Sequence, residues 1–177
     1  METLRLWPEL SRTVDRIKAR QDLFDGALLL GSLSRGEGDS ISDIDLVAVT
    51  PQGSWQQAWN NRRTLSVGAL TTFDRSEGKA GIAGHNWLTP TLVKIECLIA
   101  EPGAMRLHGS VAVIAGSDDL LSRFERVPPF SRQDIDNYAA ELRESGAISD
   151  VERAYGDLIS LLRREVRPTV GQGRALE

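Results

Sequence analysis

The sequence has little of what small extracellular or zinc-bound proteins need in order to fold. Its 177 residues include one cysteine, Cys97, and two histidines. A single thiol excludes a disulfide framework and is typical of a reducing compartment. A chain of this length can bury roughly 70% of its unfolded surface, so hydrophobic packing can stabilise it without cross-links. The histidines, His85 and His108, lack zinc-ligand spacing and are predicted to be surface or loop residues.

Long apolar runs and a positive charge excess are also absent. Apolar runs such as 27–30 and 111–115 are far shorter than the roughly 20 residues of a membrane span. The first residues lack a basic and then apolar signal pattern, so we expect a cytoplasmic protein without a membrane partner. Lys and Arg number 21 against 25 Asp and Glu, a formal charge of −4. That balance disfavours nucleic acid as a partner, because a surface that coats nucleic acid needs excess positive charge.

The periodicity of apolar residues predicts about five strands with flanking helices. We expect these elements to form an α/β (α+β) fold built on one mixed sheet. Apolar residues at helical spacing from Leu6 to Phe24 predict a first helix that closes at Asp25-Gly26. A capping box beginning at Ser54 predicts another helix. Residues 74–86 are rich in glycine and polar side chains and predict a loop. Strands are expected at 27–30, 44–50, 65–73, 91–100 and 111–115.

The sequence changes character at Gly116. Three cap-like signals follow, beginning at Ser117, Ser131 and Ser149, and each precedes apolar residues at helical spacing. We therefore predict a domain over 1–116, a helical appendage over 117–168 and a tail over 169–177.

The stretch from Gly31 to Val47 carries the chemical signal. Gly31-Ser32 follows an expected strand, so the backbone can turn sharply and a ligand can approach closely. A helix starting just beyond would present free N–H groups to a phosphate. Asp43 and Asp45 open the next expected strand at i, i+2 spacing, which places both carboxylates on one face. Such a pair repels unless a cation lies between them, and Mg²⁺ prefers oxygen ligands of this kind.

This segment resembles the signature of the DNA polymerase β-type nucleotidyltransferase superfamily. That signature is Gly-Ser, often continued as Ser-x-x-Arg-Gly, then a spacer and Asp-apolar-Asp. Gly31-Ser32, Arg35-Gly36 and Ser42-Asp43-Ile44-Asp45 match it. The resemblance implies that the nucleotide binds at Gly31, Ser32, Arg35 and Ser42. A Gly-x-x-x-x-Gly-Lys-Ser/Thr loop is absent, which excludes a P-loop enzyme.

The resemblance also implies a third carboxylate on a later strand, for which the sequence offers two candidates. Glu96 alternates with Ile95 and Cys97 in an expected strand, which suits a carboxylate directed from a sheet face into a site. Asp74 lies at an expected strand end beside Arg75, where an exposed turn residue is the simpler interpretation. We favour Glu96 as the third catalytic and metal-binding residue beside Asp43 and Asp45.

The resemblance implies transfer of a nucleoside monophosphate from a nucleoside triphosphate, with ATP expected, to a hydroxyl of a small molecule. Two Mg²⁺ ions would clamp the attacking and leaving oxygens. Compact size and a helical appendage are similar to the small antibiotic-resistance nucleotidyltransferases that act on aminoglycosides or lincosamides. Seven acids against two arginines in 134–157 favour a polycationic acceptor, or form a solvated helix face. The alternative is a minimal nucleotidyltransferase-type antitoxin that modifies or binds a partner protein.

Overall fold

The computed structural model describes residues 6–38, 42–76 and 80–128, together with Gln133, Asn137 and Ala140. The chain divides into two compact units, 1–129 and 130–177. In the second unit the three described positions are helical, and Gln133 Nε2 donates a hydrogen bond of 2.9 Å to Asn137 Oδ1. The rest of the helices predicted at 131–168, and the tail predicted over 169–177, lie outside the described residues.

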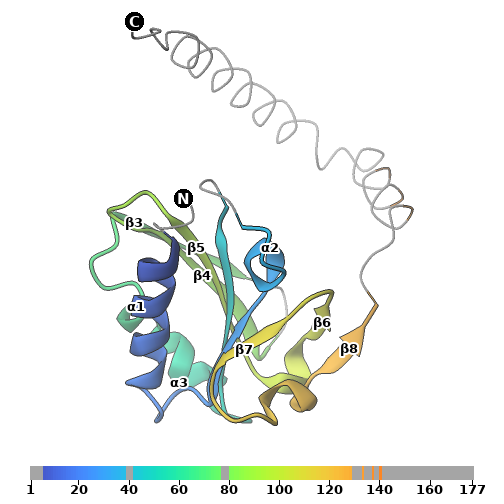
Figure 1. Cartoon of the computed structure of the whole chain (residues 1–177). Helices are drawn as coiled ribbons and strands as arrows, with labels where there is room; N and C mark the ends of the chain where they lie inside the picture. The colour runs from blue at the N-terminus through green and yellow to red at the C-terminus, as the bar shows by residue number, and fades with distance from the viewer. Residues whose placement is uncertain are drawn as a thin grey trace, which may run out of the picture. The chain divides into compact units, whose positions relative to one another are not determined.

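The first unit is an α+β structure (Figure 1). Its helices are α1 Leu6–Lys18, α2 Gly31–Ser34 and α3 Trp55–Asn60, with 3₁₀ turns η2 Arg62–Thr64, η3 Pro102–Ala104 and η4 Leu120–Arg123. Its strands are β1 Gly26–Leu29, β2 Ile44–Val49, β3 Thr71–Ser76, β4 Ile82–Leu88, β5 Lys94–Ala100, β6 Arg106–His108, β7 Ala112–Ala115 and β8 Glu125–Val127. Within the described part of the chain, no helix is long and apolar enough to cross a membrane.

Six strands form one mixed sheet in the order β3-β4-β5-β2-β1-β7. Neighbouring strands run antiparallel except for β2 and β5, which are parallel. The short strands β6 and β8 pair separately, also in parallel. The mixed sheet with flanking helices confirms the predicted fold class.

The two faces of the sheet are covered differently. Helices α1 and α3 pack on one face, where Ile95, Cys97 and Ile99 of β5 join the larger hydrophobic core. The opposite face holds a smaller core, in which Val47 of β2 packs with Phe124 from the segment after η4. Because side chains alternate along a strand, β2 and β5 each send every second residue to this second face.

The prediction of a loop over 74–86 is wrong. Strand β3 continues to Ser76, and β4 begins at Ile82 and is almost entirely buried. The polar residues of β4 find partners inside the protein: His85 binds two side chains, and Asn86 Oδ1 accepts from the Cys97 N–H at 3.2 Å. Buried polar groups that are bonded in this way cost little, so a polar sequence can form a central strand.

Two predicted elements begin or end elsewhere. Helix α1 ends at Lys18, and turns carry the chain to the buried Phe24, so the helix does not reach Asp25-Gly26. The strand predicted over 65–73 begins only at Thr71. The turns before it are held by Arg16, whose guanidinium donates to the Leu65 and Val67 carbonyls at 2.8 Å each.

The cap-like signals at Ser54 and Ser117 act differently from the prediction. Helix α3 does begin after Ser54, but the Ser54 side chain makes no capping bond, and the Trp55 N–H donates to Glu101 Oε1 at 3.1 Å. After Ser117 the chain forms η4 and then β8, rather than the first helix of an appendage. Pairing of β8 with β6 and burial of Phe124 explain why the helix does not extend.

Candidate functional site

Strands β2 and β5 bring the predicted carboxylates together on the second face of the sheet. In their parallel register Asp45 lies opposite Glu96, and the buried Ile44 lies opposite the buried Ile95. Because Ile44 and Ile95 point into the larger core, Asp45 and Glu96 point to the other face. Asp43 directly precedes β2, and its negative charge acts on Asp45.

Lys94 lies among these carboxylates. Its Nζ is 2.9 Å from Asp43 Oδ2 and also forms an ion pair with Glu96 Oε1. The Lys94 and Asp43 side chains are each 39% exposed, and Glu96 is 32% exposed. We call Asp43, Asp45, Lys94 and Glu96 the carboxylate site. Sequence reasoning assigned Lys94 no role, although its i, i+2 spacing from Glu96 places both on one face.

The carboxylate site carries more negative than positive charge. Burial raises the pKa of Asp45, the charges of Glu96 and Asp43 raise it further, and Lys94 opposes them. Burial alone would lower the pKa of Lys94, but its bonds to Glu96 and Asp43 leave it raised. Three carboxylates therefore share one ammonium, and Asp45 bears the unbalanced charge.

Gly31 lies directly against Asp45. The Leu30 N–H donates to the Asp45 carbonyl at 2.9 Å, and Gly31 follows with φ of +67°. A Cβ at Gly31 would overlap Asp45 Oδ2. Both the left-handed backbone and the close carboxylate require glycine at this position. The structure thus joins the Gly-Ser turn to the Asp-apolar-Asp segment, two motifs that are separated in the sequence.

A hollow of about 140 Å³ opens beside Asp45 and Glu96. Its wall includes Arg75 of β3 and Asn86 of β4, neither of which the sequence pointed to. Arg75 lies opposite Gly84, and a Cβ built there would be 3.4 Å from the Arg75 Cβ. Only the strand pairing shows that Arg75 lies beside this glycine.

The remaining predicted nucleotide-binding residues lie on the segments that flank the carboxylate site. Ser32 belongs to α2 beside Gly31, and Ser42 directly precedes Asp43. Arg35 Nη1 donates to the Gly31 carbonyl at 3.1 Å, while Arg35 Nε pairs with Glu37 at 2.6 Å. Arg35 is thus tied to the glycine turn by one nitrogen and to an exposed carboxylate by another.

Asp74, the alternative third carboxylate, belongs to a different cluster. Its Oδ2 accepts from Arg62 Nη2 at 2.8 Å, and its Oδ1 lies 2.7 Å from His85 Nδ1. His85 Nε2 lies 2.9 Å from Ser66 Oγ. We call Arg62, Ser66, Asp74 and His85 the histidine cluster. The prediction that His85 is a surface or loop residue is wrong, because its side chain is 1% exposed.

The histidine cluster joins three segments of the chain. Ser66, His85 and Asp74 are linked in the order of the catalytic triad of a serine hydrolase. However, Ser66 and His85 are buried, and Arg62 donates a hydrogen bond to Asp74. The bond to Arg62 lowers the pKa of Asp74, and burial lowers the pKa of His85 against the pull of Asp74. Each charge in the cluster has a partner, so the cluster stabilises the contact of β3 and β4 with the turn at Ser66.

The chemistry of the carboxylate site suits a hard cation. All donors of Asp43, Asp45 and Glu96 are carboxylate oxygens, the ligand type that Mg²⁺ prefers. Across the described ranges no group of three His, Cys, Asp or Glu side chains is spaced to hold a metal as it lies. In this arrangement the Lys94 ammonium is paired with both Asp43 and Glu96. By donor type alone, the three side chains fit Mg²⁺.

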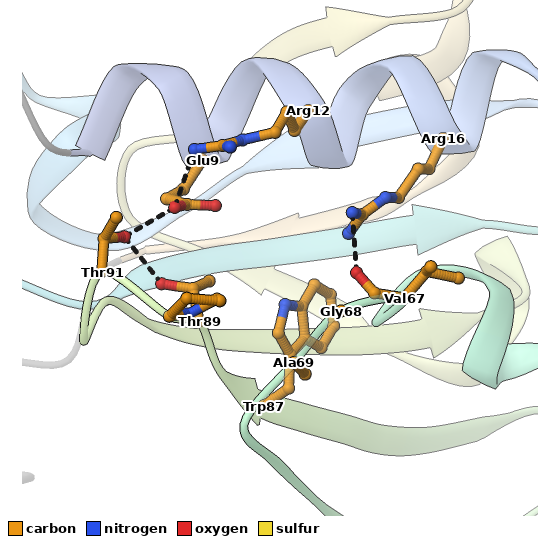
Figure 2. Close-up of a pocket in the computed structure, with 10 residues that line it drawn as sticks. Glu9, Arg12, Arg16, Val67, Gly68, Ala69, Trp87, Thr89 and Thr91 are labelled. Atoms are coloured by element: carbon orange, nitrogen blue, oxygen red, sulfur yellow. Dashed lines mark hydrogen bonds and ion pairs between the residues drawn. The ribbon is translucent and has the colours of Figure 1, made fainter.

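A second hollow, of about 220 Å³, lies on the face covered by α1 (Figure 2). Its polar groups already bind one another. Glu9 Oε1 accepts from Thr91 Oγ1 at 2.6 Å and from Arg12 Nη2 at 2.8 Å. Arg16 donates to the Val67 carbonyl across the hollow. These internal bonds stabilise the contact of α1 with the turns beneath it.

Comparisons with known proteins give a limited result. No family model and no curated protein matches the chain. Solved structures do match, among them a chain from "Structure and function of the polymerase core of TRAMP, a RNA surveillance complex". That chain is 23% identical with a TM-score of 0.34, and the match covers 50% of this protein and 29% of the other chain. The TRAMP polymerase core is a weak structural neighbour, and the functional argument rests on the carboxylate site.

Proposed function

We propose that this protein is a magnesium-dependent nucleotidyltransferase. It transfers a nucleoside monophosphate from a nucleoside triphosphate, with ATP as the first candidate, to a hydroxyl of a small molecule. The observation that carries the proposal is the meeting of Asp43, Asp45 and Glu96 beside the Gly31 turn. Oxygen donors of this kind suit Mg²⁺, which keeps phosphate oxygens as its remaining ligands.

Each carboxylate has a role in this proposal. Asp43 and Asp45 hold the metal against the triphosphate, and Glu96 receives the proton of the attacking hydroxyl. The acceptor oxygen bonds to the α-phosphorus as the bond from that phosphorus to the diphosphate oxygen breaks, and diphosphate leaves with the electron pair. Bound Mg²⁺ would neutralise charge on the attacking and leaving oxygens.

The glycine turn supports the same reaction. Gly31 has no side chain, so the Asp45 carboxylate lies directly against the turn from which Ser32 follows. Ser32 follows directly and offers a hydroxyl. Arg35 is exposed and already donates to the Gly31 carbonyl, so exchange of Glu37 for a phosphate requires only a side-chain rotation.

The test is incubation of the full chain with ATP, Mg²⁺ and panels of aminoglycosides and lincosamides, followed by mass spectrometry of the small molecules. The expected result is an acceptor heavier by one adenylyl group, together with released diphosphate. Asp43→Asn/Asp45→Asn is the matched control and should give neither product. Intact acceptors with every nucleoside triphosphate would contradict the proposal for this class of acceptor.

The acceptor class and the cytoplasmic setting remain part of the proposal. The seven acidic residues of 134–157, which favour a polycationic acceptor by their charge, lie outside the described residues. A partner protein is the alternative acceptor, as in the antitoxin function. Copurification of a protein with the tagged chain, followed by its nucleotide-sized mass gain with ATP and Mg²⁺, would favour that alternative.

A further inference from the structure

Lys94 is the positive charge that lies directly on the proposed metal ligands. Its Nζ is 2.9 Å from Asp43 Oδ2 and is also paired with Glu96 Oε1. These two residues come from different segments, Asp43 before β2 and Glu96 within β5, so Lys94 joins the two halves of the site. Without it, Asp43, Asp45 and Glu96 would be three like charges with mutual repulsion.

A divalent cation and the Lys94 ammonium compete for the same oxygens. Mg²⁺ binds carboxylate oxygens at about 2.0–2.1 Å and demands near-octahedral geometry. An ammonium at hydrogen-bond distance from those oxygens blocks part of the metal's coordination sphere, and its positive charge repels the ion. Lys94 and a divalent cation therefore cannot bind the oxygens of Asp43 and Glu96 at the same time.

The Lys94 side chain is able to leave. It is 39% exposed, and its flexible stem carries a compact charge that water solvates well. When a nucleoside triphosphate is present, its phosphates offer the Lys94 ammonium a new negatively charged partner. The backbone of Lys94 is fixed by pairing with Leu88 in β4, so the ammonium moves while the strand stays in place.

We infer that Lys94 is a built-in counterion: it holds Asp43 and Glu96 in position while no metal is bound, and it gives up these oxygens when a divalent cation binds. This inference rests on the proposed function, since that function supplies the cation. It assigns Lys94 a positioning role and makes metal binding an exchange of one cation for another. Metal affinity without nucleotide is therefore lower than three carboxylates alone would give.

Manganese binding measured without nucleotide tests the exchange. Free Mn²⁺ is quantified by electron paramagnetic resonance for the wild type, Lys94→Met and Lys94→Arg. Lys94→Met should bind Mn²⁺ about tenfold more tightly at low ionic strength, because the competing charge is gone. Lys94→Arg keeps the charge and should stay near the wild type. Lys18→Met, which removes an exposed lysine from the end of α1, is the matched control and should change affinity less than twofold.

Thermal unfolding gives a second readout that needs no activity. Metal-free Lys94→Met should melt below the wild type, because its carboxylates lose their counterion, and Mn²⁺ should raise its melting temperature more than that of the wild type. Lys94→Gln repeats the test if the methionine variant does not fold. Equal or weaker Mn²⁺ binding by both uncharged variants would overturn the inference.

The outcomes also separate this inference from the proposed function. Tighter Mn²⁺ binding by Lys94→Met without any nucleotide transfer by the wild type supports the counterion role and counts against the transferase. Transfer by the wild type with unchanged Mn²⁺ binding in Lys94→Met supports the transferase and overturns the counterion role. Failure of every protein to bind Mn²⁺, with and without ATP, overturns both.

Discussion

The carboxylate site and the histidine cluster both include acidic side chains at neighbouring strands, three in the first and one in the second, and their charges are balanced differently. In the histidine cluster the Asp74 carboxylate has directed bonds from Arg62 and His85. In the carboxylate site three carboxylates share Lys94, and the pKa of Asp45 is raised. A balanced cluster stabilises the fold by itself, whereas a surplus of one charge gains from a ligand of the opposite charge. The comparison therefore separates structural acids from candidate functional acids.

Replacement of Asp45 should have the largest effect on activity. Asp45→Asn should lower nucleotide transfer about 10²–10³-fold, because metal charge stabilisation contributes several kcal/mol to the barrier. Metal-free Asp45→Asn should be at least as stable as the wild type at pH 7, since the substitution removes a half-buried, unbalanced charge. Turnover by mass spectrometry and urea unfolding measure the two effects.

Asp74→Asn is the control from the histidine cluster. It should reduce the free energy of unfolding and leave transfer per folded molecule unchanged, because Asp74 binds Arg62 and His85 rather than the carboxylate site. Loss of transfer in Asp74→Asn with full activity in Glu96→Gln would reverse the assignment of the third carboxylate and break the comparison.

Gly31 offers the next largest effect. Gly31→Ala should reduce stability by about 1–2 kcal/mol from the left-handed backbone alone, and more because its Cβ would overlap Asp45 Oδ2. Gly36→Ala is the matched control, since Gly36 has φ of +73° and nothing within 4 Å of its built Cβ. Urea unfolding and Mn²⁺ binding of both variants are the measurements. Equal losses of stability in both variants would mean that the Asp45 side chain moves away from a Cβ at position 31 at no cost.

The two regions should respond to pH with opposite signs. In the folded protein the pKa of His85 is lowered from 6.5, chiefly by burial, and that of Asp74 is lowered from 3.8 by Arg62. Groups with lowered pKa values bind protons more readily after unfolding, so acid destabilises the fold. The His85 contribution is complete above pH 6.5 and is lost below it, and that of Asp74 follows below 3.8.

Asp45 should show the reverse trend. Its pKa is raised above 3.8, so its ionisation disfavours the folded state as pH rises through that raised value. The stability gain of Asp45→Asn over the wild type should therefore be small near pH 4 and larger at pH 7. Urea unfolding at several pH values measures it, and His85→Asn should flatten the wild-type slope between pH 7 and 5. A gain that is largest in acid would contradict the raised pKa.

The smallest expected effect is that of Ser32. Ser32→Ala should weaken ATP binding about fivefold, because one hydroxyl donor contributes about 1 kcal/mol and the neighbouring backbone donors remain. Calorimetric titration in the presence of a divalent cation measures it. A loss of ATP affinity larger than the loss in Gly31→Ala would mean that the Ser32 hydroxyl, rather than the backbone of the glycine turn, is the main phosphate contact.

The sequence was sufficient for features that depend on local alternation. Period-two patterning in β2 and β5 was enough to expect Asp45 and Glu96 on a sheet face, and the apolar segments were enough to expect strands with flanking helices. Neither depends on which strands are neighbours. The motif from Gly31 to Asp45 was visible for the same reason, since its residues are close in the sequence.

Features that depend on strand pairing could not be predicted. Strand β4 looked like a loop because His85 and Asn86 are polar, and their partners come from residues 66, 74 and 97. The contact of Lys94 with Asp43 spans 51 residues and requires the parallel register of β2 and β5. Sequence patterns report on which face a residue lies, but not on what lies opposite.

Cys97 shows what the central position of β5 means for experiments in solution. Its thiol is buried, and burial raises its pKa to about 12, so at pH 7 the side chain stays in its unreactive thiol form. Cysteines introduced elsewhere can be labelled with the natural thiol left in place. The slow rate at which Cys97 itself is modified then reports how often β5, the strand that carries Lys94 and Glu96, opens.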